Sequence, residues 1–489
     1  MKKIFNCRAV EPPLWLSALP IASLLGFFAC IVIFLGADAI ADYSHFALLG
    51  ASVVAFVIAV SCGSLCRRGL AVGFRRSARQ ILPAVPMLVC IAMVATTWML
   101  SGVVPTLVDY GIRLLSPTLF LFVTCIVCGV ISVLTGSSWS TIATIGLAFM
   151  GIGAAMGIPA PWVAGAIISG AYFGDKVSPL SDTTVVASSA CGVDLFKHIR
   201  YLMITAIPSM AIALAVFLIA GFNIPMAGEV AKADIVDLLD KVFVISPYTL
   251  IIPVVTITMI VLRVPTLLVL LGSAMLGLGG IFVFQPGIVE MLSADGIMPM
   301  ICRLLWGETV FNSGNAMFDD LVGTSGITGM LPTVALVLCA MLFGTVMIGT
   351  GMLSRLTGAL TAKLRSRFTL VAGTVGSGLF INACTADQYL SLIIGGNMYR
   401  NAYRRYGLEP RLLSRTLEDS VSVTSVLIPW NSCGVTQSAV LGVPTVMYLP
   451  YCVFNYLSPL MSLAMAFTGY RIKQHVTGIR IARPSLSTK

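Results

Sequence analysis

The chain has 489 residues, of which 58% are hydrophobic and 10% charged, whereas a soluble domain carries about 25% charged residues. Its mean hydropathy of +0.97 is typical of a polytopic membrane protein and excludes an ordinary soluble enzyme. The net charge of +10 comes from basic residues in short clusters between apolar spans, a pattern that orients membrane helices and argues against nucleic-acid binding. Most of the 13 cysteines lie in apolar spans and there are three histidines, so we expect no metal centre and no cofactor.

The apolar stretches predict an all-α protein with about 10–12 spanning helices, because about 20 apolar residues cross a bilayer. The first stretch, 14–36, is about twice as long as a signal-peptide core, so it predicts a spanning helix. Stretches of about 40 residues predict hairpins or helix pairs. The stretches lie at about 14–36, 46–66, 84–104, 117–158, 160–193, 199–221, 247–286, 296–316, 331–352, 369–398, 418–441 and 442–470.

One short motif occurs twice, 250 residues apart. The segment 179–193 (PLSDTTVVASSACGV) aligns with 429–443 (PWNSCGVTQSAVLGV), and Pro, Val, Ser, Gly and Val match at fixed positions. Paired interrupted apolar segments are typical of secondary transporters, because broken helices leave backbone dipoles free near mid-membrane. We therefore expect two membrane repeats, at 14–222 and 261–472.

The charges of the loops predict that the two repeats are inverted. The loop with Arg67, Arg68, Arg75, Arg76 and Arg79 is basic, whereas its counterpart near 317–329 contains Asp319 and Asp320 and no cation. The basic loops of membrane proteins face the cytoplasm. This predicts a cytoplasmic N-terminus (1–13), an extracytoplasmic linker (223–260) and a cytoplasmic tail (473–489). A separate spanning helix at 247–262 would change the parity and contradict the inversion.

Each repeat contains an apolar arm, a small polar tip and a second apolar arm. The tips are Thr135-Gly-Ser137-Ser138-Trp-Ser-Thr and Asn382-Ala-Cys-Thr385-Ala-Asp387-Gln. No charges flank the tips, as they would between two ordinary spans, so we predict re-entrant hairpins, whose irregular backbone survives where protein or water satisfies it. The alternative is a packing motif, since Gly, Ser and Thr also let helices approach closely.

The stretch 169–184 places two carboxylates and a lysine among apolar residues that Pro179 interrupts. An ionisable group within the membrane is costly and predicts a functional site. Asp175 and Lys176 could neutralise one another. Asp182, flanked by hydroxyls, has the oxygen chemistry that a hard cation such as Na⁺ prefers, and a carboxylate can also hold a proton. Its alternative role is the N-cap of a helix that begins at Thr183.

The second half supplies different groups at the equivalent positions. Asp182 aligns with Ser432, which follows Asn431, and Asp387 aligns with Ser137. One carboxylate site from each half is therefore expected. Glu418 and Asp419 follow two arginines by one to two turns, which predicts a salt-bridged cytoplasmic helix end. The predicted ion- and proton-binding residues are Asp182, Asp387, Asp175, Ser137, Ser138, Thr183, Asn382, Thr385, Asn431 and Ser432.

Three segments resemble the NhaC-type sodium/proton antiporter family. They are 165–184 (GAIISGAYFGDKVSPLSDTT), 385–389 (TADQY) and 427–434 (LIPWNSCG). The resemblance implies the architecture of the ion transporter superfamily, with inverted repeats, two re-entrant hairpins and two broken helices around a central site. Members mostly exchange Na⁺ or Li⁺ for H⁺, and relatives couple Na⁺ and H⁺ to malate and lactate.

We therefore predict a transporter of the bacterial inner membrane that exchanges Na⁺ or Li⁺ for H⁺ by alternating access. The alternative is an exchanger of a small organic anion, such as malate or lactate, or of an amino acid. The sequence places no arginine at mid-membrane to bind the carboxylate of an organic anion. This favours Na⁺ or Li⁺ over an organic anion as the transported substrate. HExxH and GxSxG motifs are lacking, so an intramembrane enzyme is not expected. Lipid, the two ions and a second copy in a homodimer are the expected partners.

Overall fold

The computed structural model describes residues 12–36, 39–65, 67–82, 84–224, 229–294, 296–311, 313, 318–319, 322–361 and 366–472. Within them the chain is helical, and extended pairing is limited to one isolated bridge between Thr309 and Thr324. The first half contains α1 (Leu14–Leu35), α2 (Ile40–Ser61), α3 (Arg67–Ile81), α4 (Ala84–Leu100), α5 (Val103–Leu114), α6 (Pro117–Thr135), α7 (Ser138–Thr141), η1 (Ile142–Gly146), α8 (Leu147–Ala155), α9 (Ala160–Val177), α10 (Asp182–Cys191) and α11 (Leu195–Asn223).

The second half begins after a linker that contains its own helices. The linker helices are α12 (Glu229–Val242), η2 (Pro247–Leu250) and α13 (Ile251–Val261). They are followed by α14 (Thr266–Phe284), α15 (Pro286–Leu292), α16 (Ile297–Trp306), η3 (Thr328–Met330), α18 (Leu331–Gly349), α19 (Met352–Thr361), α20 (Arg367–Thr385), α21 (Gln388–Arg405), α22 (Pro410–Leu417), η4 (Glu418–Ser422), η5 (Ser425–Leu427), α23 (Ser432–Leu441), α24 (Thr445–Tyr448), η6 (Leu449–Tyr451) and α25 (Val453–Thr468).

The described residues form a multi-pass membrane protein. Eight helices are long and apolar enough to cross a bilayer, or ten if each of two sharply bent pairs is one span, which meets the lower end of the predicted number. Large apolar side chains such as Ile33, Phe34 and Phe222 are more than 60% exposed. Such a surface is stable only against lipid.

The helices repeat at the interval that the sequence motif predicts. The first hairpin arm α6 ends at Thr135 and α20 ends at Thr385, and the half-helices α10 and α23 begin at Asp182 and Ser432. Each of these positions recurs 250 residues later. Both half-helices end at a left-handed glycine, Gly192 and Gly442, a common helix terminator because glycine lacks a Cβ.

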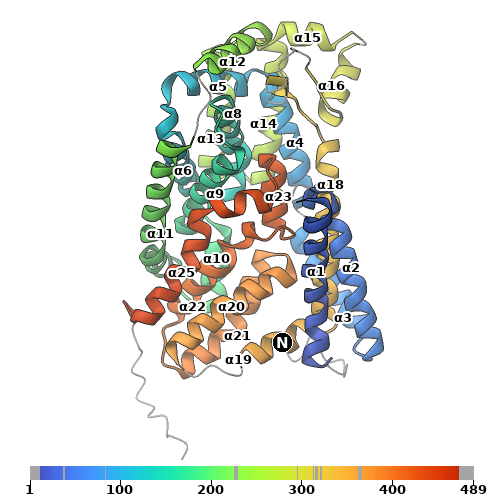
Figure 1. Ribbon diagram of the computed structural model, residues 1–489, viewed down its shortest axis with the longest axis vertical. Coiled ribbons are helices and arrows are strands. Elements are labelled where there is room, and N and C mark those ends of the chain that lie inside the picture. The colour runs from blue at the N-terminus through green and yellow to red at the C-terminus, as the bar shows by residue number, and fades with distance from the viewer. Residues whose placement is uncertain are drawn as a thin grey trace, which may run out of the picture.

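The two hairpins lie in opposite halves of the molecule, as inverted repeats require. In Figure 1, α6 and α8 occupy the upper half and α20 and α21 the lower, while α10 lies below α23. Helices α3 and α19 and the N-terminal end lie at the lower face, and α12 lies at the upper one. The basic loops at 67–79 and 355–367 were predicted to share one side, opposite the linker, and the helices that carry Arg67 and Arg355 do so.

The helix at 251–261 does not cross the membrane alone. Helix α13 has 11 residues, about 16 Å of helix, and this is about half the thickness of the hydrocarbon core. It continues from the end of α12 after a bend of 87°. A full span at 247–262, which would have changed the parity, would need part of α12 as its second segment.

Candidate functional site

The first hairpin tip binds the end of α9. Gly136 ends α6 with φ 69°, and Ser137 caps α7 by accepting a hydrogen bond from the Ser140 backbone N–H. The next residue, Ser138, donates its hydroxyl proton to Asp175 Oδ2 at 2.7 Å, and its backbone N–H also points to that oxygen at 3.2 Å. Asp175 on α9 is thus held by the hairpin tip, and not by Lys176 as one interpretation of the sequence proposed.

The second hairpin tip has the same backbone design with a carboxylate in the capping position. Ala386 ends α20 in the left-handed region at φ 54°, and the Asp387 side chain accepts a hydrogen bond from Leu390 N at 2.7 Å. A left-handed alanine costs about 1 kcal/mol, so tertiary contacts hold it: the Ala386 carbonyl accepts the Ser432 backbone N–H at 2.9 Å. Thr385 closes the tip through Ser391, with 2.7 Å between the hydroxyls.

Equivalent contacts tie each tip to the broken helix of its own repeat. Ser138 bonds Asp175 in the first repeat, and Gln388 bonds Ser425, 250 residues later, at 3.2 Å. The polar side chain five residues before each capping residue, Ser137 or Asp387, also donates to a carbonyl: Ser132 to Ala171 at 2.6 Å, and Asn382 to Val421 at 2.9 Å. The hydrogen bond between Ser138 and Asp175 thus has its counterpart between Gln388 and Ser425, but only the first repeat has a carboxylate in this position.

The side-chain amides of Asn431 and Asn382 form hydrogen bonds at the helix break that precedes α23. Asn431 caps α23 by accepting the Cys433 backbone N–H at 3.0 Å, and it donates to Asn382 Oδ1 at 2.9 Å. Asn382, Asn431 and Ser432, predicted together from sequence, are therefore in contact, and each is less than 10% exposed.

Asp182 does not cap its helix. The cap of α10 is Ser181, whose hydroxyl accepts the Thr184 backbone N–H, and Asp182 is the first helical residue. Thr183 is buried and bonds Ser181 at 2.9 Å between hydroxyls. The Asp182 side chain is exposed on a face of α10 shared with Ser189. A carboxylate is tolerated there when that face meets water rather than lipid.

Tyr389 lies within electrostatic range of carboxylates from both halves. Tyr389 is the second residue after Asp387. The three carboxylates in range of it are Asp175, Asp182 and Asp387. The sequence predicted one carboxylate from each half at a common centre, and it overlooked Tyr389. Its place in the TADQY tip was the available signal.

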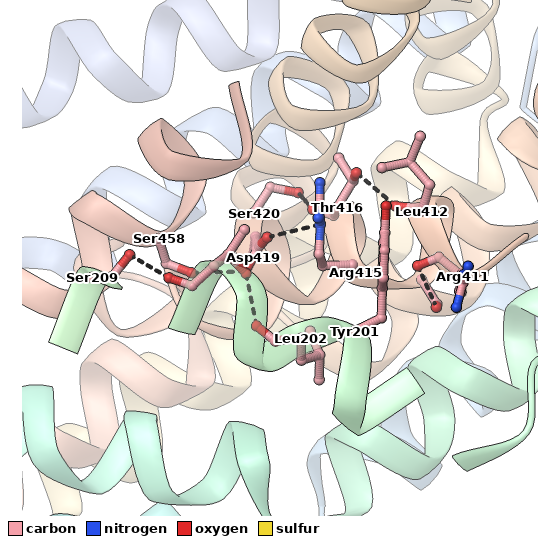
Figure 2. Close-up of polar contacts among 12 residues, drawn as sticks. Tyr201, Leu202, Ser209, Arg411, Leu412, Arg415, Thr416, Asp419, Ser420 and Ser458 are labelled. Carbon is pink, nitrogen blue, oxygen red and sulfur yellow. Dashed lines mark hydrogen bonds and ion pairs between the residues drawn. The ribbon is translucent and has the colours of Figure 1, made fainter. Parts of the chain in front are cut away.

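A second buried group of charges lies where α9, α11, η4 and α25 meet. Lys176 forms an ion pair with Asp419, and both side chains are no more than 1% exposed. Asp419 Oδ1 also accepts the hydroxyls of Ser458 at 2.9 Å and Thr205 at 3.1 Å. Figure 2 shows Asp419 between Ser458 and Arg415.

The prediction of a salt-bridged cytoplasmic helix end at Glu418 and Asp419 was wrong. Both side chains have no exposed surface, because α10, α20, α21 and α25 surround η4. The i,i+4 pair with Arg415 does form, loosely, at 3.9 Å between Arg415 Nε and Asp419 Oδ2. The missed signal was Lys176, a cation in an apolar stretch that needed a partner.

The sequence placed no arginine at mid-membrane to hold a carboxylate, but the structure buries one. Arg415 is fully buried, and its guanidinium lies 4.6 Å from the centre of the Tyr201 ring, as Figure 2 shows. Such stacking is favourable for a weakly hydrated cation. The sequence placed this arginine at a cytoplasmic helix end, because charged residues that follow one another by one to two turns usually face solvent.

In the described part of the chain, no three His, Cys, Asp or Glu side chains group as metal ligands. The one CxxC spacing, Cys125 and Cys128, is buried on α6, and the Cys125 Sγ faces Met210 Sδ at 4.0 Å. The polar atoms described at the two hairpin tips are oxygen atoms of carboxylates, hydroxyls and carbonyls, with amide groups beside them. These are ligands for hard cations and protons.

The family model described as the Na⁺/H⁺ antiporter family matches residues 8–201 and 170–470. The chain belongs to this family. It is similar to the Na⁺/H⁺ antiporter NhaC of Alkalihalophilus pseudofirmus, with 36% identity over 387 residues that cover 78% of this chain and 81% of that protein.

Other relatives in this antiporter family carry the names of organic solutes. The arginine/ornithine antiporter ArcD of Halobacterium salinarum is 33% identical over 466 residues, 94% of this chain and 93% of that protein. The malate-2H⁺/Na⁺-lactate antiporter of Bacillus subtilis is 34% identical over 392 residues, 79% of this chain and 81% of that protein.

Proposed function

We propose that this protein exchanges Na⁺ or Li⁺ for H⁺ across the bacterial inner membrane by alternating access, as a transporter that needs no resident cofactor. One observation carries the proposal: Asp175, Asp182 and Asp387, from both repeats, all lie within electrostatic range of Tyr389. Carboxylates together with hydroxyl oxygens suit a hard cation. Protons and Na⁺ would compete for these oxygens, and the ions would thereby be exchanged.

The buried cations support a cation as cargo. Lys176 is ion-paired with Asp419, and Arg415 is stacked on Tyr201 beside the same carboxylate. Neither is left free at a hairpin tip to bind the carboxylate of an organic acid. The two ions and lipid are then the partners of the chain. A second copy in a homodimer is a further expectation.

A second candidate function is exchange of an amino acid or a small organic anion coupled to Na⁺ or H⁺. Arg415 favours it, because Nε, Nη1 and Nη2 are buried without a hydrogen-bond acceptor among the described residues. A guanidinium binds carboxylates in a bidentate manner. The relatives named for arginine, ornithine, malate and lactate are similar to this chain over most of its length.

Proteoliposomes with a pH-sensitive dye inside separate the two functions. Na⁺, Li⁺, K⁺, malate and arginine are added in turn to wild type and Asp182→Asn. We expect Na⁺ and Li⁺ alone to move protons, and the variant to lose this response. Asp194→Asn is the matched control, because Asp194 is an exposed cap of α11 and asparagine caps equally well.

A response only when malate or arginine is present would establish the second candidate instead. Asp182 would then serve a coupling ion.

Asp387 allows capping and charge to be tested separately. Asp387→Ser installs the residue that the first repeat uses at this position, so it keeps the helix cap and removes the charge. Asp387→Ala removes both. We expect cation-driven proton movement to be lost in both variants. Thermal unfolding in detergent should show a loss of about 1 kcal/mol in the alanine variant alone. Wild-type transport by Asp387→Ser would show that Asp387 only caps α21.

A further inference from the structure

Glu418 is a buried acid that neither hairpin tip uses. It begins the π-helical turn Glu418–Ser422, and its side chain has no exposed surface. Neither carboxyl oxygen has a hydrogen-bond donor in the part of the chain that the structure describes. An ionised carboxylate buried without donors costs many kcal/mol, so this conformation fits the neutral carboxyl, with its proton bound.

The side chains around Glu418 explain why it stays unpaired. Lys176 and Asp175 on α9 are within electrostatic range, and Cys191 on α10 is a further titratable neighbour. Lys176, the cation on that side, is already bound to Asp419. Arg415 on the same helix faces Tyr201. An ionised Glu418 would therefore compete with Asp419 for Lys176, which couples its protonation to the ion pair between the two repeats.

Two hydroxyl groups, those of Thr183 and Ser181, lie between Glu418 and the carboxylate of Asp175. Thr183 and Ser422 approach Glu418 without reaching hydrogen-bonding geometry in this state. The Thr183 hydroxyl bonds Ser181 at 2.9 Å, and Ser181 lies beside Asp175. Asp182, between these two hydroxyls in sequence, is exposed. A proton leaving Glu418 could pass to Thr183 Oγ1 as Thr183 passes its own hydroxyl proton to Ser181 and Ser181 passes its own to the Asp175 carboxylate.

The π-helical turn at this position is a second, independent feature. π-helical turns inside α-helices are rare and occur frequently at functional sites. In the first repeat the structurally equivalent region of α9 is a regular α-helix, and Ile168 stands where the second repeat has Glu418. At this position the acid and the π-helical turn occur in the second repeat alone, whereas the π-helical turn of the first repeat, Ile142–Gly146, lies in the second arm of its hairpin.

We propose that Glu418 is a proton-binding site of this transporter, separate from the cation-binding carboxylates Asp175, Asp182 and Asp387, and that Thr183 and Ser181 connect it to Asp175. The inference rests on the proposed coupling to protons and adds a proton carrier that does not bind the cation. Because Glu418 would not bind the cation, the rate of exchange would still depend on pH at saturating Na⁺.

The test compares Glu418→Gln with wild type in proteoliposomes, with two readouts. The first is Na⁺-driven proton movement between pH 6 and 9, and the second is exchange of ²²Na⁺ for unlabelled Na⁺ without a pH gradient. We expect the variant to retain sodium exchange and to move fewer protons per Na⁺ with a flatter pH profile, because Asp175, Asp182 and Asp387 still bind protons while the contribution of Glu418, at most about tenfold per pH unit for one proton, is removed. Glu409→Gln is the matched control, since Glu409 is a part-buried partner of Arg411 at the start of α22.

Wild-type proton movement and pH profile in Glu418→Gln would overturn the proposal. Loss of both readouts in a folded variant would also overturn it, because Glu418 would then belong to the cation site or to the scaffold. Should the glutamine variant not fold, Glu418→Asp is expected to shift the pH profile, and an unshifted profile would count against the site.

A wild type that moves no protons with Na⁺ would refute the proposed function rather than this inference. The same variants are then compared with the solute to which wild type responds. Retention of its proton dependence by Glu418→Gln would overturn the role of Glu418 there too.

Discussion

Replacing Lys176 by methionine is expected to destabilise the folded protein by about 3–5 kcal/mol, the usual consequence of removing one partner of a buried ion pair. Asp419 would remain with no exposed surface. Its closest cation would then be Arg415, whose Nε lies 3.9 Å away. The hydroxyls of Ser458 and Thr205 do not supply a compensating charge. The effect is measured by heating the protein in detergent and recording, at each temperature, how much of the monodisperse peak remains in size-exclusion chromatography.

The double variant Lys176→Met with Asp419→Asn should recover most of the lost stability. Asparagine still accepts hydrogen bonds from Ser458 and Thr205, and a neutral pair avoids the cost of desolvating two charges. Lys197→Met is the control, because Lys197 is exposed at the start of α11 and should change the stability by less than about 0.5 kcal/mol. If the single variant is as stable as wild type, Asp419 is not ionised and the ion pair is not a structural link between the repeats.

Gly170→Ala and Gly174→Ala are expected to separate the first hairpin from α9. A Cβ at Gly170 would lie 2.2 Å from the Cys125 carbonyl oxygen, and one at Gly174 would lie 2.3 Å from the Gly129 carbonyl oxygen. Both obstacles are backbone atoms of α6, so the helices must move apart. Overpacking of this kind costs about 1–3 kcal/mol and occasionally more. The shift would also pull Ser138 from Asp175, so cation-driven transport should fall together with stability.

Gly376→Ala is the matched control for these two glycines. It lies in α20 of the second hairpin, where a Cβ would meet nothing within 4 Å. Alanine is the better helix former by about 0.5–1 kcal/mol, so this variant should be as stable as wild type or slightly more so. Normal stability and transport in Gly174→Ala would show that α6 and α9 tolerate separation and that their close approach does not position the tip.

The repeat and the hairpin tips could be predicted because local sequence encodes them. Pro179 and Pro429 lie in the two helix breaks, since proline lacks the N–H that continues a helix, and Gly136 supplies a left-handed turn that other residues rarely adopt. The matched bounds of α10 and α23 follow from these signals. The cap of α10 was assigned one residue too late because Ser181 and Asp182 are both good caps and sequence alone does not choose between them.

The burial of charges could not be predicted in the same way. Glu418 and Asp419 follow arginines in sequence, the usual pattern of a solvated helix end, and only the surrounding helices bury them. The second-half position that aligns with Lys176 is Val426, so the repeat gave no hint of the ion pair. Tyr389, likewise, becomes important only because Asp175 and Asp182 of the other repeat approach it.

The sequence by itself determined that this chain is a helical membrane protein of two related halves with polar, broken segments, because hydropathy, proline and glycine act over a few turns of chain. It also identified the family through motifs of contiguous residues. The tertiary structure alone decided which charges meet: Lys176 and Asp419 are 243 residues apart, and Glu418 acquires its burial from four other helices. Electrostatic partnership depends on distance in space and on exclusion of water, and neither quantity is written in the order of residues.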